Sequence, residues 1–160
     1  MSVNIYLQAI ISEDIYETNK DKIDFEVSSA ATDSFDCLKK HLPYNGLDFT
    51  NAKIISVGLW GILSDYFWTE RLEYSAFPEL EGKIGEYAWV NFYINEPKSG
   101  ESTPINAGYM LNYAKGIDLV LKSDSKYKEY LKHFRKAKLE KFCNLARKYG
   151  WESKIFWSVT

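Results

Sequence analysis

The sequence predicts one α+β domain spanning residues 1–160, with an antiparallel or mixed sheet of about five to six strands and helices packed on one face. Three observations support this fold class. The chain has 160 residues, which suits a single domain. Several short segments alternate apolar with polar residues, which is the period of a half-buried strand. Near the C-terminus, apolar residues recur at three- and four-residue steps, which is the period of an amphipathic helix.

Three strands are expected in the first part of the chain. Residues 3–11 and 23–27 alternate apolar with polar side chains, so each has one buried face, and we expect the two strands to pair antiparallel. The polar, acidic segment 12–22 between them is expected to be a loop. The segment 53–60 is rich in Ile and Val, which favours a third strand.

Two helices are expected on either side of this third strand. Thr32 or Asp33 can cap a short helix through a side-chain oxygen, and Pro43 ends it because the residue before proline avoids helical angles. Residues 62–74 fit a helix by the spacing of their apolar residues and a strand by their aromatic content, and we favour the helix.

The next part of the chain is expected to add more strands and one more helix. Residues 84–94 show the clearest alternation, and one face of this strand is aromatic. A helix that starts at Pro104 is expected to end at Gly116, because glycine favours helix ends. The remaining expected strands are 117–121 and 154–159.

A long C-terminal helix, at about 124–149, is the element with the strongest pattern. Ser123 or Asp124 can cap its start, and Gly150 is a typical left-handed residue just beyond a helix end. Leu131 and Phe134 lie in the middle of its apolar stripe and are expected to be buried. Its opposite face is rich in lysine and arginine.

The two parts of the chain carry opposite charge. Residues 1–101 contain 17 Asp/Glu and 8 Lys/Arg, whereas residues 102–160 contain 5 Asp/Glu and 12 Lys/Arg. One interpretation is that the basic helix neutralises an acidic sheet inside one molecule. The other is that two exposed patches of opposite sign exist, one of which meets a partner. The sequence leaves both open.

The cysteines and the hydropathy pattern indicate a cytoplasmic protein. Cys37 and Cys143 form no disulfide framework, and both lie on apolar faces, so we expect buried, inert thiols in a reducing compartment. The N-terminus alternates polar with apolar residues and has no basic region, so it is expected to be a strand rather than a signal peptide. No apolar stretch is long enough to span a membrane.

Candidate catalytic chemistry is limited to one weak pair. Cys37 and His41 are four residues apart on the short expected helix, where a thiolate and an imidazole could form a nucleophile or half a metal site. No phosphate-binding glycine loop, zinc motif or nucleophile elbow is present, and we expect no cofactor and no metal. Nucleic acid is an unlikely partner, because the aromatic residues of the basic helix lie on its apolar face and the pI is about 5.8.

Acidic side chains interleaved with aromatic ones are the strongest candidates for a binding surface. Carboxylates steer a basic protein towards its site, and buried aromatic side chains anchor it there. One group of carboxylates lies between residues 13 and 26, and a second group lies between residues 65 and 81. The candidate partner-binding residues are Glu13, Asp14, Glu17, Asp65, Trp68, Glu70, Glu73 and Tyr74.

In this acidic, aromatic and motif-poor character the chain resembles the small immunity proteins with which bacteria neutralise toxin nucleases. The resemblance is one of overall character across the whole chain, and it rests on no family motif. It implies a non-enzymatic inhibitor whose acidic surface covers a basic toxin. Two alternatives remain: an enzyme with an unrecognised site near Cys37, His41 and carboxylates, or a small-ligand or assembly module that uses Tyr87, Trp89 and Tyr93 of the aromatic strand face. The oligomeric state is left open.

Overall fold

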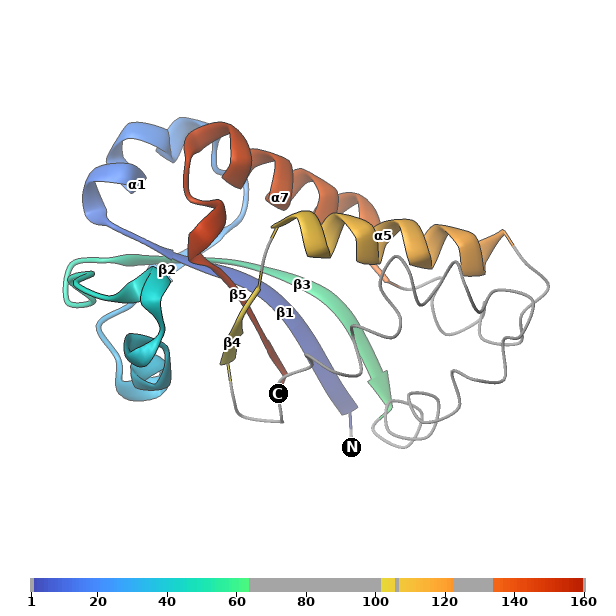
Figure 1. Ribbon diagram of the computed structural model, residues 1–160, viewed down its shortest axis with the longest axis horizontal. Helices are drawn as coiled ribbons and strands as arrows, with labels where there is room; N and C mark the ends of the chain where they lie inside the picture. Colours follow the sequence, from blue (N-terminus) through green and yellow to red (C-terminus); the bar gives the residue numbers. More distant parts are fainter. Residues whose placement is uncertain (1, 64–101, 106, 123–133, 160) are drawn as a thin grey trace.

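The described strands form one antiparallel sheet in the order β2-β3-β1-β5-β4 (Figure 1). The computed structural model describes residues 2–63, 102–105, 107–122 and 134–159. The central strand β1 pairs with β3 on one side and with β5 on the other, and the short strands β2 and β4 lie at the two edges. The strands are β1 (Ser2–Ile11), β2 (Glu26–Ser29), β3 (Lys53–Leu63), β4 (Ser102–Pro104) and β5 (Ile155–Val159).

The α+β class, the antiparallel sheet and a C-terminal helix are confirmed, but within the described residues fewer of the individually expected strands are present. Four of the six correspond to β1, β2, β3 and β5. The expected strand 117–121 is helical instead, and the expected strand 84–94 lies outside the described residues. The helix favoured for residues 62–74 is wrong at its start, because β3 continues through Leu63, and the rest of that segment lies outside the described residues. The edge strand β4 was not expected.

The expected pairing of the first two strands is wrong, because β2 pairs with β3 rather than with β1. Both edges of β1 are already taken, since β3 pairs along its whole length and β5 pairs with Ile5 to Ala9. The connection is not a loop either. Helix α1 (Glu13–Asn19) and the 3-10 turn η1 (Lys20–Lys22) lead the chain away from β1 towards the far side of β3.

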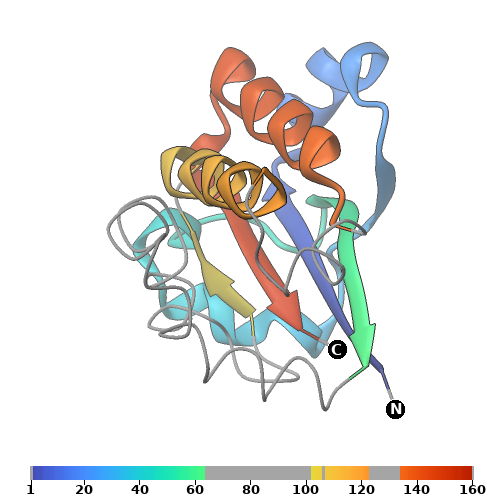
Figure 2. The ribbon, with the colours of Figure 1, turned by 90° about the vertical axis from the view of Figure 1, so that its right-hand side faces the viewer.

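Two long helices lie side by side on one face of the sheet (Figures 1 and 2). Helix α5 (Ala107–Leu121) runs through Gly116, where the sequence predicted its end, and the helical hydrogen bond from Lys122 N–H to the Asp118 carbonyl closes its last turn. Helix α7 (Lys136–Tyr149) ends at Gly150, whose φ of 79° is the left-handed cap expected there. Both helices bury apolar residues against β1, β3 and β5, and this forms the main core.

The C-terminal helix is shorter than the expected 124–149, because its start is displaced by the sheet. The backbone at Phe134 and Arg135 is not helical, and the Arg135 N–H donates to the Leu59 carbonyl of β3 at 2.8 Å. Leu59 is the extra residue of a bulge, since Ile5 pairs with Trp60 while Tyr6 pairs with Gly58. Phe134 is buried as expected, whereas Leu131 lies outside the described residues.

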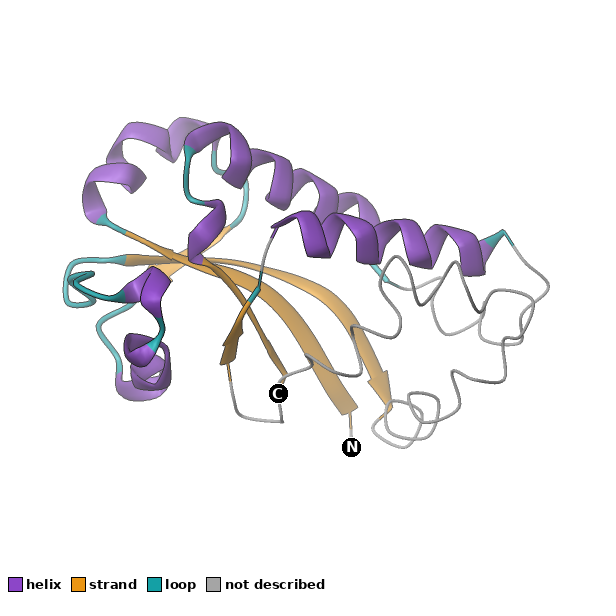
Figure 3. Ribbon diagram, viewed as in Figure 1, coloured by secondary structure: helices purple, strands orange, loops and turns teal. Residues whose placement is uncertain are grey.

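The opposite face of the sheet carries a second, smaller core, so the expectation of helices on one face only is incomplete. Two 3-10 segments, η2 (Asp33–Lys40) and η3 (Leu42–Tyr44), lie beneath one end of the sheet (Figure 3). Leu38 and Tyr44 of these segments pack with Ile10, Ile54 and Phe156 of the sheet. Strand β1 is therefore buried on both faces at this end, which its simple alternation did not indicate.

A polar row crosses the middle of this second face. The Gln8 side chain of β1 donates a hydrogen bond to Ser56 Oγ of β3 at 3.2 Å and accepts one from Ser158 Oγ of β5 at 2.9 Å. Ser158 is only 8% exposed, so its hydroxyl needs this partner.

Candidate functional site

Helix α1 presents the first group of candidate residues to solvent. Ser12 caps the helix, with its Oγ accepting from the Ile15 N–H at 3.3 Å, and Glu13 and Asp14 occupy the first turn, where the helix dipole stabilises negative charge. Ile15 and Tyr16 are half-buried against the main core. The helix therefore turns its apolar side inward and exposes Glu13, Asp14 and Glu17, which we call the acidic face.

Most carboxylates of this region form no ion pair with another described residue. Glu17 pairs with Lys20 at 2.9 Å, but both side chains are more than half exposed. Asp24 pairs with Lys141 of α7 at 3.0 Å, and that hydrogen bond lowers the pKa of the Asp24 carboxyl. The remaining carboxylates form no ion pair with any residue in the described part of the chain: Glu13, Asp14, Asp21 and Glu26.

The second group of candidate residues cannot be placed beside the first. Asp65, Trp68, Glu70, Glu73 and Tyr74 all lie outside the described residues. The aromatic strand face of the third alternative lies outside them as well. The acidic face of α1 is therefore the part of the expected surface that lies within the described residues.

The Cys37–His41 pair does not share a helix face. Residues 33–40 form a 3-10 segment with three residues per turn, so positions four apart point in different directions, and His41 lies beyond its end. Cys37 is exposed, contrary to expectation, because Phe35 and Leu38 carry the inward contacts of this segment. Cys143 is buried as expected, and burial raises the pKa of its thiol to about 12.

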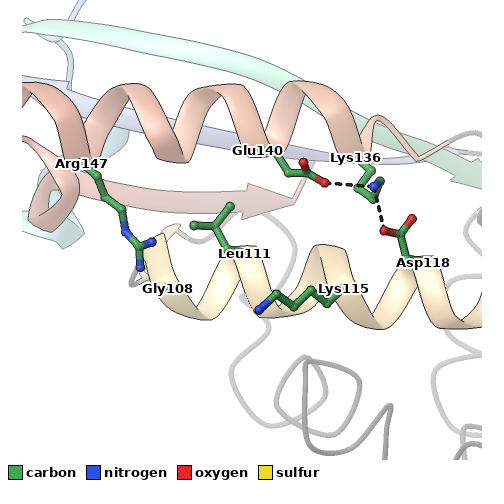
Figure 4. Close-up of a pocket in the computed structure, with 7 residues that line it drawn as sticks. All are labelled: Gly108, Leu111, Lys115, Asp118, Lys136, Glu140 and Arg147. Atoms are coloured by element: carbon green, nitrogen blue, oxygen red, sulfur yellow. Dashed lines mark hydrogen bonds and ion pairs between the residues drawn. The ribbon is translucent and has the colours of Figure 1, made fainter.

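A groove of about 620 Å³ between α5 and α7, which we call the helical groove, was not anticipated (Figure 4). Lys136 Nζ lies 2.9 Å from an oxygen of Asp118 on α5 and 3.0 Å from an oxygen of Glu140 on α7. The hydrogen bond with Asp118, and then that with Glu140, raises the pKa of Lys136. Arg147, at the other end of the groove, pairs with Glu152 at 3.4 Å. These charges fasten the two helices to each other and to the following turn.

A second groove, of about 560 Å³, lies between α1 and the end of α7. Asp14 and Thr18 of α1 line one wall, and Arg147 and Lys148 of α7 line the other. With the Asp24–Lys141 pair, this groove shows that the acidic and basic parts of the chain do meet along one side of α1. The internal-neutralisation interpretation therefore describes part of this surface, while the acidic face beyond the groove remains open.

The remaining features of the described residues give no sign of a catalytic centre. Nowhere in the described ranges do three or more His, Cys, Asp or Glu side chains gather in a way that could hold a metal ion. None of the described helices is both long and apolar enough to cross a membrane. The one fully buried polar side-chain atom without a partner in this part of the chain is the indole nitrogen of Trp151, which packs edge-on against Phe142.

Comparison with known proteins assigns no family to the chain, so its class rests on the fold alone. No protein-family model matches the chain, and no curated protein and no solved structure matches it either. The described residues form an α+β fold with an antiparallel sheet, two helices joined by buried apolar residues and by the Lys136–Asp118 ion pair, and a short acidic helix at one corner.

Proposed function

We propose that the chain is a non-enzymatic, protein-binding inhibitor of the immunity-protein kind, which neutralises a basic toxin of the nuclease type through its acidic surface. The single observation that supports this proposal is the acidic face of α1. Glu13 and Asp14 are exposed and form no ion pair within the described residues, although lysines and arginines are plentiful in the chain. Unpaired exposed carboxylates attract a basic partner and raise its rate of association.

The positions of three cations outside α1 support the same proposal, because each of them is paired with a carboxylate of its own chain. Lys136 and Lys141 are held by carboxylates of their own chain, and Arg147 is held by Glu152. Residues 13–26 carry six Asp/Glu and two Lys/Arg, so this corner keeps a negative excess after its internal pairs are formed. A basic partner supplies the missing positive charge.

The experiment uses the purified product of the neighbouring open reading frame as the probe. Its binding to the full chain is measured by surface plasmon resonance at several salt concentrations, and any nuclease activity is measured with and without the chain. We expect tight binding, loss of nuclease activity, and slower association as salt screens the charges. If the chain neither binds that product nor inhibits its nuclease activity at micromolar concentrations, the proposal is wrong.

Charge neutralisation on α1 then tests the surface itself. The double change Glu13→Gln with Asp14→Asn should slow association about two- to fivefold and flatten its salt dependence, because each exposed charge contributes less than about 1 kcal/mol. The control is Asp36→Asn, which removes an exposed carboxylate on η2 that pairs with Lys39 at 2.7 Å and lies away from the acidic face. Equal slowing by the control would show that net charge, rather than the acidic face, drives association.

A further inference from the structure

The outer edge of β2 offers backbone hydrogen-bonding groups. The Ala30 N–H donates to the Ala52 carbonyl at 3.1 Å, which continues the β2–β3 ladder by one step. Hydrogen-bonded and non-hydrogen-bonded pairs alternate in an antiparallel ladder, so Ser28 bonds to β3 while Val27 and Ser29 turn their N–H and C=O groups outward. No described residue hydrogen-bonds to these outward groups.

This edge is short and carries one charged side chain, Glu26, but it lacks the other usual protections of an exposed strand. Glu26, Ser28 and Ser29 are exposed, and β2 contains no proline, no lysine and no bulge. The opposite edge differs, because β4 carries Pro104 within its three residues. Val27 packs on the main core and holds β2 in place, and no described strand pairs with the outer edge of β2.

The open edge lies at the same corner of the molecule as the acidic face. Lys53 pairs with Ser29 in the sheet, and its Nζ lies 6.0 Å from the ring centre of Tyr16 on α1. In Figure 2, β2 follows α1 along the outer margin of the sheet, beyond β3. Glu26, at the start of β2, adds an exposed carboxylate without an ion pair in the described part of the chain.

We propose that the outer edge of β2 accepts an extended, basic segment of the partner as an additional strand, an inference that rests on the proposed function and names its mode of binding. Main-chain bonds to Val27 and Ser29 supply the pairing, and Lys or Arg side chains of the segment lie beside Glu26. Electrostatic repulsion between two copies of the chain favours the basic segment over a second copy as the occupant of this edge. Pairing of two copies through β2 places two Glu26 carboxylates and two acidic helices at one interface, where like charges repel.

The first test uses a defined peptide, N-acetyl-(Lys-Val)4-amide, and amide hydrogen exchange of the full chain. At a peptide concentration about ten times its Kd, exchange at Val27 and Ser29 should slow about tenfold, because the peptide occupies their outward N–H groups. The matched peptide N-acetyl-(Glu-Val)4-amide should have no effect. Slowing by both peptides, or slowing confined to other residues, would overturn the proposal.

The second test removes a single outward N–H. Proline in an edge strand is tolerated where the N–H faces solvent, so Ser29→Pro should keep the ladder with β3 intact. The control Ser29→Ala also loses the hydroxyl that accepts from the Ala31 N–H, but it keeps the Ser29 N–H. We expect Ser29→Pro to weaken peptide binding about three- to tenfold relative to Ser29→Ala, the worth of one hydrogen bond. Equal affinities would contradict the proposal, and if the proline variant unfolds, the exchange experiment on the unchanged chain still decides.

The same variants separate this inference from the proposed function. If the product of the neighbouring open reading frame binds Ser29→Pro as tightly as the unchanged chain, the strand-addition mode is wrong while the inhibitor proposal stands. If the peptide protects Val27 and Ser29 but that product does not bind, the edge proposal stands and the inhibitor proposal fails. Protection that rises with the concentration of the chain alone would assign the edge to a second copy and overturn the basic occupant.

Discussion

The helical groove and the acidic face of α1 contain the same kinds of charged side chain but place them in opposite situations. In the groove, Lys136 lies between Asp118 and Glu140, so each charge has its counter-charge within 3.0 Å. On the acidic face, Glu13 and Asp14 lack any such neighbour among the described residues. Charges of the first kind hold the molecule together, whereas charges of the second kind are available to another molecule. Changes in the two regions should therefore affect different measurements.

The largest expected effect lies in the main core, where α7 packs against the sheet. Phe142 of α7 is fully buried and packs edge-on against Phe25 and Trp151, with ring centres 5.2 and 5.4 Å apart. Phe142→Ala should lower the free energy of unfolding by about 3–5 kcal/mol, measured by denaturant titration. The exposed Lys138→Ala on the same helix should change it by less than about 0.5 kcal/mol. A loss below about 1 kcal/mol for Phe142→Ala would show that α7 does not anchor the fold.

A smaller effect is expected at the end of α7, where the two regions meet. Gly150 has a φ of 79°, and an added Cβ there would meet no atom within 4 Å. Gly150→Ala should therefore cost about 1–2 kcal/mol through backbone strain alone. The exposed Asn144→Ala in the same helix should instead stabilise by about 0.5 kcal/mol, because alanine is the better helix former. Thermal melts of the two variants should shift in opposite directions, and a neutral Gly150→Ala would contradict the left-handed cap.

Removal of the groove's central cation should have a modest and pH-dependent effect. Lys136→Met should destabilise by about 0.5–1 kcal/mol at pH 8, since the pair is partly exposed. The pKa of Lys136 is raised above its usual 10.5 by its carboxylate partners, so its contribution is complete below pH 10.5 and is lost as the pH rises through the folded-state value. The melting difference between variant and unchanged chain should be constant from pH 7 to 9 and shrink above that range. A difference that persists unchanged at pH 12 would show that methionine packing, rather than charge, is responsible.

The smallest effect on stability is expected at the acidic face. The change Glu13→Gln with Asp14→Asn removes favourable interactions with the dipole of α1, worth about 0.5 kcal/mol or less once physiological salt screens them. Its melting temperature should stay near that of Asp36→Asn, while its association with a basic partner slows. A large drop in melting temperature would contradict the distinction between the two regions, because it would show that these carboxylates make stabilising contacts inside the molecule.

The sequence predicted the elements whose patterns are local. Strands β1, β3 and β5 follow from alternation and from β-branched residues, and the end of α7 follows from Gly150. Ser12 followed by Glu13 and Asp14 carries the signal of a capped, acidic helix start, which could have identified α1. The acidic face was predictable for the same reason, since exposed carboxylates are the ordinary state of Asp and Glu.

The elements that were predicted wrongly depend on contacts between distant residues. The apolar run 117–121 looks like a strand by itself, but packing of α5 on the sheet carries the helix through Gly116 to Leu121. The helix expected from residue 124 is not helical at Arg135, because that residue bonds to Leu59, 76 positions earlier. The helical groove and the open edge of β2 likewise exist only once the sheet order is known, and nothing in the local sequence specifies that order.

The position of β1 has a consequence for how the protein is made. Gln8 accepts its hydrogen bond from Ser158, and the two residues are 150 positions apart in the chain. Translation proceeds at about 5–20 residues per second, so β1 waits about 10–30 s on the ribosome before β5 exists. During that time one edge of the most central strand is open to wrong partners. The β1–β5 pairing cannot form until Ser158 has been synthesised, so β1 keeps one unpaired edge while the rest of the chain is produced.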